Sequence, residues 1–407
     1  PPMSSDRKTR ILATAYDYRP GLGGVATCAF KTMQALSRIP DVELRCLARA
    51  TPGATEFDFH GHFETHRLAL NSRASLAIPA LATHLSRHLI TYQPQAILNF
   101  HWLPCGAASL LALPLRAPLH IPYFVFAHGN EIMETGRTPY KRLRQQLAPV
   151  KRNIFRGAAA VFAVSNYTAR LVQTECGVAP ENIEVVFNGV DGSAFYPEPP
   201  QAGLLEKYRL QGKRVLVTVC RLDDYKGIDR TLAALPLVLE RFPNTAYLVC
   251  GEGPDRQRLE ALSRHHGVHE HVVFTGAVPP DKLRDYYNLA DCFIMPSRLD
   301  ESAPNVEGFG IVFLEAAACE KPVIAGNSGG IPDAVEDGRS GWLVDAHGGA
   351  EQAIARAVLE CFSDTRKAKA FGKYGRMRAL ETFTWENSAR KIWERINRHV
   401  RHRGPGA

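Results

Sequence analysis

The sequence predicts an α/β protein with two doubly wound, parallel-sheet domains. Its 407 residues are too many for one hydrophobic core and correspond to about two domains of roughly 150–200 residues. Short apolar runs alternate with helix-like stretches along the chain, which is the pattern of βα units around a parallel sheet. Residues 196–201, Tyr-Pro-Glu-Pro-Pro-Gln, interrupt this alternation and form a linker by composition.

We therefore expect an N-terminal domain in residues 1–195, a C-terminal domain in residues 196–383 and a final helix in residues 384–407. Each apolar run bounded by turn residues predicts one strand. In the first half these runs are Arg10–Tyr16, Val42–Ala48, Ala96–Phe100, Tyr123–Ala127 and Ala160–Ser165. The run Val185–Val190 closes this half with a turn signal, Asn-Gly-Val-Asp, in residues 188–191. In the second half they are Val215–Cys220, Ala246–Cys250, Val272–Phe274, Cys292–Met295, Pro322–Ala325 and Gly341–Val344.

The composition, 45% hydrophobic and 22% charged, is that of an ordinary globular protein. The nine cysteines are scattered, and several, such as Cys250 and Cys292, lie in apolar runs as small buried side chains. No apolar run approaches the roughly 18–20 residues that span a bilayer, and we expect no secretory signal because the first residues lack an apolar core. These features favour a reduced, cytoplasmic protein without structural zinc.

Most of the net charge of +8 belongs to the N-terminal half. Residues 1–195 hold 20 Lys and Arg against 13 Asp and Glu, or +7, and the remainder holds 29 against 28, or +1. Within that half, residues 137–156 carry seven basic and no acidic side chains, interleaved with apolar ones at helical spacing. Such a segment suits peripheral contact with the inner face of the plasma membrane, and a solvated helix face is the alternative.

A glycine turn follows the first predicted strand. Residues 21–24, Gly-Leu-Gly-Gly, precede an apolar-periodic helix, which is the start of a Rossmann-like unit with an anion site. The turn also matches the dinucleotide fingerprint G-x-G-x-x-A, with Asp41 and Glu43 about 20 residues on. This match leaves an NAD-dependent oxidoreductase open as an alternative. Against it, the polar residues 17–20 lengthen the tight turn that the fingerprint requires.

In the second half, candidate binding residues follow the predicted strands, at the edge where parallel sheets place ligands. Arg221 and Lys226 suit a diphosphate, Arg by paired hydrogen bonds and Lys as a point charge. Further along, Glu307 and Glu315 bracket a Gly-Phe-Gly turn and the start of a helix. The turn allows close approach of backbone N–H groups, and the positive end of the helix suits a phosphate.

In the first half, His128 stands just after the strand Tyr123–Ala127, so it is a candidate ligand-binding side chain at the sheet edge. A solvated histidine in a turn is the alternative. The chain contains no Asp-x-Asp, so no carboxylate pair is expected for a divalent metal. We therefore expect no metal and no other cofactor, and a diphosphate would be neutralised by Arg, Lys and helix dipoles.

Taken as a set, these motifs resemble glycosyltransferase family 4, whose members are retaining nucleotide-sugar transferases with the GT-B fold, two Rossmann-like domains facing each other across a cleft. The resemblance covers nearly the whole chain. It rests on Gly23-Gly24, the rim at His128, Arg221-Leu-x-x-x-Lys226-Gly227, Gly251-x-Gly253-Pro254, Glu307-Gly-Phe-Gly with Glu315, and Gly329-Gly330. The residues around Glu307 are most similar to bacterial mannosyl- and hexosyltransferases, including the phosphatidylinositol mannosyltransferases.

The resemblance implies a role for each motif. The four residues implied in catalysis are His128, which would face the donor sugar, Arg221 and Lys226, which would hold the diphosphate, and Glu307, which would bind the sugar hydroxyls. Glu315 would bind the ribose. The remaining donor-binding residues would contribute mainly backbone groups or close approach, and they are Gly23, Gly24, Gly251, Gly253, Gly308, Phe309, Gly310, Ile311 and Val312.

The implied reaction moves a hexose, such as mannose or glucose, from a GDP- or UDP-sugar to a hydroxyl group. The acceptor would be a sugar or a lipid-linked molecule bound by the N-terminal domain, in lipid-linked glycan, polysaccharide or glycolipid synthesis, and no nucleic acid is expected as a partner. The leaving diphosphate would itself take the acceptor's proton on the same face, through an oxocarbenium-like state. The final helix would cross back to the N-terminal domain. As an alternative to a transferase, the same fold would also suit a nucleotide-sugar epimerase.

Overall fold

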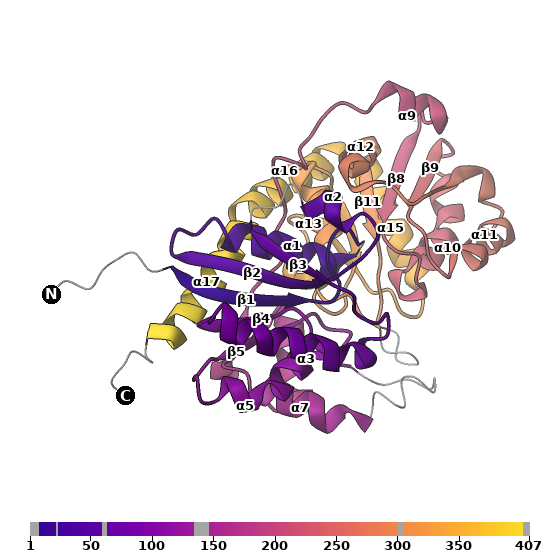
Figure 1. Cartoon of the computed structure of the whole chain (residues 1–407). Coiled ribbons are helices and arrows are strands. Elements are labelled where there is room, and N and C mark those ends of the chain that lie inside the picture. The colour runs from indigo at the N-terminus through magenta and orange to yellow at the C-terminus, as the bar shows by residue number, and fades with distance from the viewer. Residues whose placement is uncertain (1–7, 22, 59–62, 134–145, 300–304, 402–407) are drawn as a thin grey trace. The chain divides into compact units, whose positions relative to one another are not determined.

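The protein consists of two α/β units, each built on one parallel sheet (Figure 1). Unit 1 comprises residues 1–188 and 385–407, and unit 2 comprises residues 189–384. The computed structural model describes residues 8–21, 23–58, 63–133, 146–299 and 305–401. The predicted fold class, two doubly wound parallel-sheet domains, is confirmed.

The sheet of unit 1 has seven strands in the order β3-β2-β1-β4-β5-β6-β7. The strands are β1 Thr9–Ala15, β2 Val42–Arg49, β3 Glu64–Leu68, β4 Ala96–Asn99, β5 Tyr123–Ala127, β6 Ala160–Ala163 and β7 Ile183–Val185. The helices are α1 Gly24–Leu36, α2 Ala54–Asp58, α3 Ala74–Thr91, η1 Trp102–Gly106, α4 Ala107–Leu111, α5 Leu113–Arg116, α7 Ala148–Arg156, α8 Asn166–Cys176, η2 Pro180–Asn182 and α17 Trp385–Arg401.

Local sequence explains the central elements of unit 1. All five residues of β5, Tyr-Phe-Val-Phe-Ala, are buried, as expected for a parallel strand that is covered on both faces. Helix α8 begins after Ser165, whose Oγ accepts the N–H of Thr168 at 3.0 Å. Ser165 is therefore the N-cap of this helix, because its side chain satisfies an N–H group left unpaired at the helix start.

The closing run Val185–Val190 is not a strand beyond its first residue. Strand β7 ends at Val185, and the N–H of Val190 instead donates to the carbonyl of Phe383 at 2.9 Å. Val190 also forms an isolated bridge with Thr384. The chain therefore leaves the first sheet early, because residues near 190 pair with the segment that leads into α17.

The sheet of unit 2 has six strands in the order β10-β9-β8-β11-β12-β13. The strands are β8 Arg214–Val219, β9 Thr245–Cys250, β10 Val272–Gly276, β11 Cys292–Met295, β12 Val323–Gly326 and β13 Gly341–Val344. The helices are α9 Ala202–Lys207, η3 Asp224–Lys226, α10 Ile228–Leu239, α11 Arg256–His265, η4 His269–His271, η5 Pro280–Lys282, α12 Leu283–Leu289, α13 Ile311–Ala318, α14 Ile331–Ala334, α15 Ala350–Ser363 and α16 Thr365–Glu381.

Both sheets reverse their strand order beside their first strand. In unit 2 the chain runs outward through β8, β9 and β10, and then returns to add β11 on the other side of β8. Unit 1 does the same with β1 and β4. The loops after the two central strands leave in opposite directions, which opens a crevice at the carboxyl ends of the strands. This topology determines where ligand-binding side chains can meet within each unit.

Helix α17 belongs to unit 1, although unit 2 separates it from the rest of unit 1 in sequence. In Figure 1 this yellow helix lies among the indigo elements of unit 1. It buries Ile392, Trp393 and Ile396, and the Ser388 hydroxyl donates to the carbonyl of Phe187 at 2.6 Å. Burying each of these large apolar side chains contributes about 1.5–3 kcal/mol, so α17 is part of the core of unit 1.

The basic segment 137–156 is only partly visible, because residues 137–145 lie outside the described residues. Helix α7 covers its end, and Lys151 in this helix is buried, donating from Nζ to the carbonyl of Ile132 at 2.7 Å. One cation of the segment is thus structural. Among the helices that the structure describes, none is both long enough and apolar enough to cross a bilayer.

We expect Ile396→Ala to lower the free energy of unfolding of unit 1 by about 2–5 kcal/mol, because the fully buried side chain leaves a cavity. Urea unfolding followed by tryptophan fluorescence measures this change. Glu394→Ala on the exposed side of the same helix is the matched control and should change stability by about 0.5 kcal/mol or less. Equal effects of the two substitutions would contradict the packing of α17 on unit 1.

Candidate functional site

Lys226 and Glu307 form an ion pair at the carboxyl ends of the central strands of unit 2. Lys226 ends η3, in the loop after β8, and Glu307 lies in the loop after β11. The Nζ atom of Lys226 is 2.5 Å from Oε2 of Glu307, and the two side chains are only 11% and 16% exposed. The pair joins the two loops that diverge at the reversal of strand order, which is where doubly wound sheets bind ligands.

The surroundings of Lys226 keep its ammonium group charged. Burial by itself lowers the pKa of this lysine, but Glu307, with smaller contributions from Tyr225 and Cys220, outweighs burial and raises the pKa above its ordinary value. The Nζ atom also lies 4.7 Å from the ring centre of Tyr225, a cation–π contact. A permanent positive charge at this position suits an anionic ligand.

The backbone around Glu307 is held by a second glycine motif. The N–H of Gly330 donates to the carbonyl of Glu307 at 2.9 Å, and a Cβ atom on Gly329 would lie only 2.4 Å from the same oxygen. Gly310 has φ +91°, a left-handed conformation that glycine adopts without strain, and it turns the chain into α13. The two motifs therefore fix the position of Glu307 relative to the start of α13.

Helix α13 begins beside this turn and presents its positive end there. The N–H groups of Ile311 and Val312 are the first of the helix, so they have no carbonyl partner within it. Phe309 is 2% exposed, and its ring lies 5.7 Å from that of Phe383, so its side chain is part of the packed interior. A phosphate at this point would meet backbone donors and a favourable helix dipole.

Glu315 lies one turn further along α13 and is oriented by a tyrosine. Its Oε2 atom accepts the hydroxyl of Tyr287, in α12, at 2.6 Å. Tyr287 is fully buried, and the nearby Glu315 carboxylate adds to the effect of burial in raising its pKa. The tyrosine therefore stays protonated and donates, which holds the carboxylate in one orientation.

Arg221 is placed differently from Lys226. Its side chain is 71% exposed, and Nε lies 3.6 Å from Oδ1 of Asp223. The neighbouring glycines bring backbone segments together: a Cβ atom on Gly251 would lie 1.8 Å from the carbonyl of Cys220, and one on Gly253 would lie 2.4 Å from that of Leu222. These glycines let the loop after β9 contact the loop that carries Arg221. This close backbone contact explains why glycine is needed at both positions, without invoking a bound ligand.

In unit 1, Asp17 and His101 meet at the equivalent position, after β1 and β4. The Nε2 atom of His101 lies 3.3 Å from Oδ2 of Asp17. Burial lowers the pKa of His101, but Asp17 and Cys105 together outweigh burial and raise the pKa to about 9, and the contact with His101 lowers the pKa of Asp17. The Tyr16 N–H donates to Nδ1 of His101 at 3.4 Å, a long and therefore weak hydrogen bond.

His128 lies next to this pair, just after β5. Its Nε2 atom is 2.8 Å from the carbonyl oxygen of Phe100, and its backbone N–H donates to the Glu131 carboxylate. A carbonyl can only accept, so Nε2 carries the proton and Nδ1 keeps its lone pair. Burial lowers the pKa of His128, which agrees with a neutral ring.

The predicted glycine turn follows β1. Gly23, with φ +125°, is the N-cap of α1, and Gly24 is the first residue of that helix.

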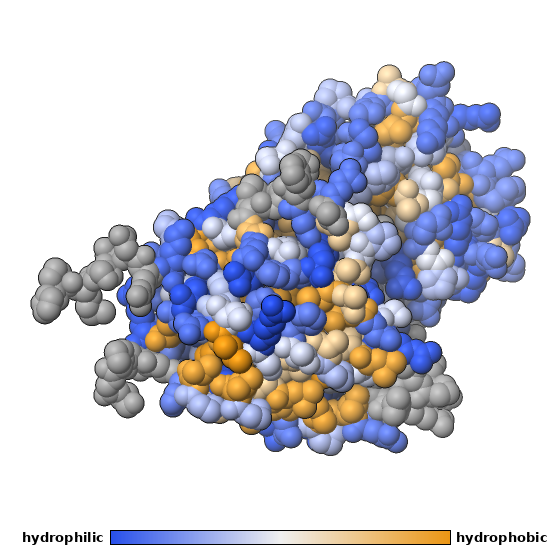
Figure 2. All heavy atoms as spheres, viewed as in Figure 1, coloured by the Kyte–Doolittle hydropathy of each residue, from blue (hydrophilic) through white to orange (hydrophobic). Residues whose placement is uncertain are grey.

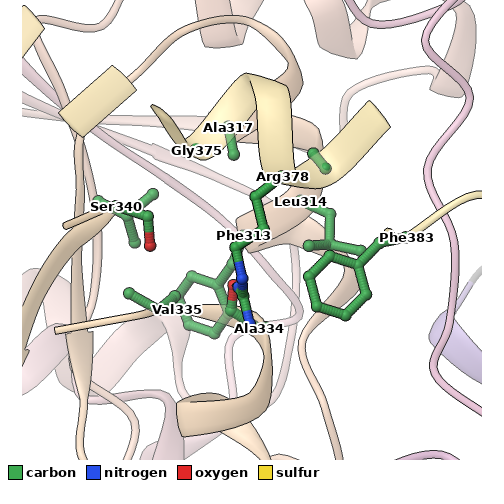
Figure 3. A pocket seen from close by; sticks show the side chains of 11 residues that line it. Phe313, Leu314, Ala317, Ala334, Val335, Ser340, Gly375, Arg378 and Phe383 are labelled. Carbon is green, nitrogen blue, oxygen red and sulfur yellow. The ribbon is translucent and has the colours of Figure 1, made fainter. Parts of the chain in front are cut away.

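A small cavity against α13 and α16 is separate from these residues (Figure 3). Its volume of about 10 Å³ is room for about one water molecule. The Arg378 guanidinium at its edge donates to the carbonyls of Ala334 and Asp333, at 2.7 and 2.8 Å. None of the predicted donor-binding residues lines this cavity, so it is a packing gap.

Across the described residues, no group of three His, Cys, Asp or Glu side chains is arranged to hold a metal.

Sequence reasoning grouped Arg221 with Lys226, but the structure brings Lys226 to Glu307. It did not single out Asp17, His101 or Tyr287. Asp17 and His101 each come just after a predicted strand, the signal that identified His128, so the same rule applied to every strand would have found them. For Tyr287, which lies in the middle of a helix, the sequence carries no such signal.

The comparisons with known proteins cover both units. Residues 22–193 match the family model Glycosyltransferase Family 4, and residues 204–378 match the model Glycosyl transferases group 1. The chain is 32% identical over 396 residues to the GDP-mannose-dependent alpha-(1-6)-phosphatidylinositol monomannoside mannosyltransferase of Mycolicibacterium smegmatis, covering 95% of this chain and 98% of the relative. The chain belongs to glycosyltransferase family 4.

This family 4 glycosyltransferase is also similar to more distant proteins. It is 27% identical to the Alpha-maltose-1-phosphate synthase of the same organism, over 95% of this chain and 98% of that relative. The crystal structure of Anabaena Alr3699/HepE in complex with UDP and glucose has a TM-score of 0.77 at 20% identity, over 96% of this chain and all of that one, and shows the GT-B fold. The glycine turn near residue 23 falls within the Family 4 match, so the oxidoreductase alternative is wrong.

We expect the Lys226–Glu307 pair to be strongly coupled. Lys226→Met alone leaves a buried carboxylate without its cation and should cost roughly 3–5 kcal/mol of stability, whereas Lys226→Met with Glu307→Gln should cost less than the sum of the single changes. Urea unfolding of the four proteins gives the coupling energy. Effects that add within about 0.5 kcal/mol would contradict a pair that is formed in solution.

The Asp17–His101 pair should make stability depend on pH in the alkaline range. The pKa of His101 rises from 6.5 to about 9 on folding, so the stabilisation is complete below about pH 6.5 and is lost as the pH rises through about 9. We expect His101→Gln to cost up to about 3 kcal/mol near pH 6 and much less near pH 10. Urea unfolding at both pH values checks this, and a loss independent of pH would count against the ion pair.

Proposed function

We propose that this glycosyltransferase moves a mannosyl group from GDP-mannose to a hydroxyl of a lipid-linked acceptor, with retention of the anomeric configuration. The observation that carries the proposal is the Lys226–Glu307 pair beside the start of α13, at the point of unit 2 where strand order reverses. The choice of GDP-mannose and of a lipid-linked acceptor is supported by the 32% identity, over nearly full length, to a mannosyltransferase named for both.

The donor diphosphate is the proposed ligand of the cationic part of the site. Lys226 supplies a buried charge, and the exposed guanidinium of Arg221 supplies a second that can close on the phosphates. The N–H groups of Ile311 and Val312 add fixed donors at the start of α13. Together these groups would neutralise the leaving diphosphate, so no metal is required.

The sugars of the donor are assigned to the carboxylates and the glycine turn. The Glu315 carboxylate, oriented by its hydrogen bond from Tyr287, accepts hydrogen bonds from the ribose hydroxyls. Glu307, with the backbone of Gly308, Phe309 and Gly310, binds the hexose hydroxyls. In unit 1, His128 has its proton on Nε2, so its Nδ1 lone pair can accept a hydrogen bond from a hydroxyl group.

This arrangement favours the leaving group as the base. Glu307 is already bound by the ammonium group of Lys226 at 2.5 Å, so it is poorly suited to attack the anomeric carbon or to remove a proton. In the proposed step, the bond from the anomeric carbon to the diphosphate oxygen breaks while the bond to the acceptor oxygen forms on the same face. The acceptor's proton passes to the departing phosphate oxygen, so the anomeric configuration is retained.

We expect GDP and GDP-mannose to raise the melting temperature of the protein, because a ligand that binds only the folded state stabilises it by mass action. UDP should raise it less, and NAD should leave it unchanged. Thermal shift measurements on the four ligands test the donor, and proton NMR of the product formed from GDP-mannose tests retention. A response to NAD alone, or a product of inverted configuration, would overturn the proposal.

Arg221→Ala separates donor binding from folding in the same assays. Because this side chain is 71% exposed, its loss should leave the melting temperature of the free protein unchanged but weaken the GDP response. Transfer should fall by about 2–4 kcal/mol of transition-state stabilisation. Arg264→Ala, also exposed and at the end of α11, is the matched control and should behave as the unaltered protein. Unchanged transfer in Arg221→Ala would remove its diphosphate role.

A further inference from the structure

Exposed apolar side chains gather on one face of unit 1. Six large aliphatic residues on α3, α4, α5 and the segment after α5 are between 40% and 63% exposed, and they are Leu76, Ile90, Leu111, Leu113, Leu115 and Leu119. In Figure 2, orange side chains gather over the region where α3 and α5 lie in Figure 1. Over the described part of unit 2, only Leu237 and Met377 are exposed large hydrophobics. We call these six residues the leucine face.

The leucine face follows from the amphipathic pattern of α3 and its neighbours. On α3, Leu76, Arg87 and Ile90 recur at a spacing that places them on one side of the helix. The opposite side, with Leu81 and Leu85 among others, is buried in the core of unit 1. Helix α3 contacts both α4 and α5, so the exposed leucines of these short helices extend the same surface.

The chain segment that carries the leucine face has charges of one sign. Residues 65–130, which contain the whole of it, include no Asp or Glu. Arg73 at the start of α3 and Arg87 on its outer side are exposed, and no side-chain ion pair to either of them occurs among the described residues. An apolar surface whose own chain segment carries cations and no acids complements an anionic lipid surface, because the apolar side chains enter the interface while the cations meet the headgroups.

The same charges argue against a second copy of the chain as the occupant. In a two-fold contact the same patch lies on both partners, so Arg73 and Arg87 of one copy would approach the identical cations of the other. Like charges brought together at an interface oppose association. A bilayer with anionic lipids meets both properties of the surface at once.

We propose that the leucine face docks unit 1 onto the surface of an anionic phospholipid bilayer, with α3 lying in the plane of the interface. This surface is made of other residues than the basic segment 137–156, and it uses hydrophobic insertion together with cationic attraction. The inference does not rest on the proposed transferase reaction, because membrane binding can be measured without donor or acceptor. Failure of one therefore leaves the other standing.

The test is co-sedimentation of the full chain with vesicles of phosphatidylcholine alone and of phosphatidylcholine with phosphatidylglycerol. The protein should bind the anionic vesicles and bind the neutral ones much more weakly. Leu113→Ser combined with Leu115→Ser and Leu119→Ser should lower the partition coefficient about tenfold or more, because less apolar surface is buried. Arg87→Ser should lower it about fivefold on anionic vesicles only.

Two controls keep the result specific. Leu237→Ser with Met377→Ser removes similarly exposed apolar side chains from unit 2 and should leave vesicle binding unchanged. All variants should keep the melting temperature of the unaltered protein, because the replaced side chains are exposed. Equal vesicle binding by the triple variant, or a dimer in light scattering that the triple variant dissociates while vesicles do not bind, would overturn the proposal.

Discussion

The ion pair between Lys226 and Glu307 is the interaction on which the candidate site of unit 2 depends. Strand order drives the loops after β8 and β11 apart, and this pair is a direct link between them. The carbonyl of Glu307 also anchors the Gly329-Gly330 turn, and the residues after Glu307 start α13. A charged lysine that is only 11% exposed needs an oppositely charged partner. Replacing either residue of the pair alone would therefore leave a buried charge unpaired and destabilise the contact between the two loops.

Unit 1 repeats this arrangement with different chemistry. Asp17 and His101 also follow the first strand and the strand that returns beside it, and they too form a charged pair. The sign is exchanged, because the first strand is followed by the acid in unit 1 and by the base in unit 2. In both units the charged pair lies where the strand order reverses, so its position follows from the topology. Which of the two loops carries the acid and which the base follows from the local sequence.

Much of the fold could be predicted from the sequence because most strands are short, continuous apolar runs. Strands such as β5 and β11 were predicted with the bounds that the structure has. Strand β3, Glu-Thr-His-Arg-Leu, was not predicted, because an edge strand in contact with solvent carries no apolar run. The pairing of Val190 with Phe383 was not predicted, because the two residues lie almost 200 positions apart and leave no local signal.

The candidate site could be predicted only as separate pieces. Lys226 and Glu307 each stood out locally, by their place after a strand and beside a glycine turn. Their direct contact depends on which strands are neighbours, and Arg221 seemed the natural companion of Lys226 because the two are close in sequence. The orientation of Glu315 by Tyr287 depends on how α12 and α13 pack, which no spacing in the chain encodes.

The discontinuous make-up of unit 1 has a consequence for how the protein is made. Unit 2 is one uninterrupted stretch, so all its strands are available once residue 384 has left the ribosome. Unit 1 cannot cover the surface that receives Trp393 and Ile396 until α17 has also been synthesised. The half of the chain that emerges first is therefore completed last.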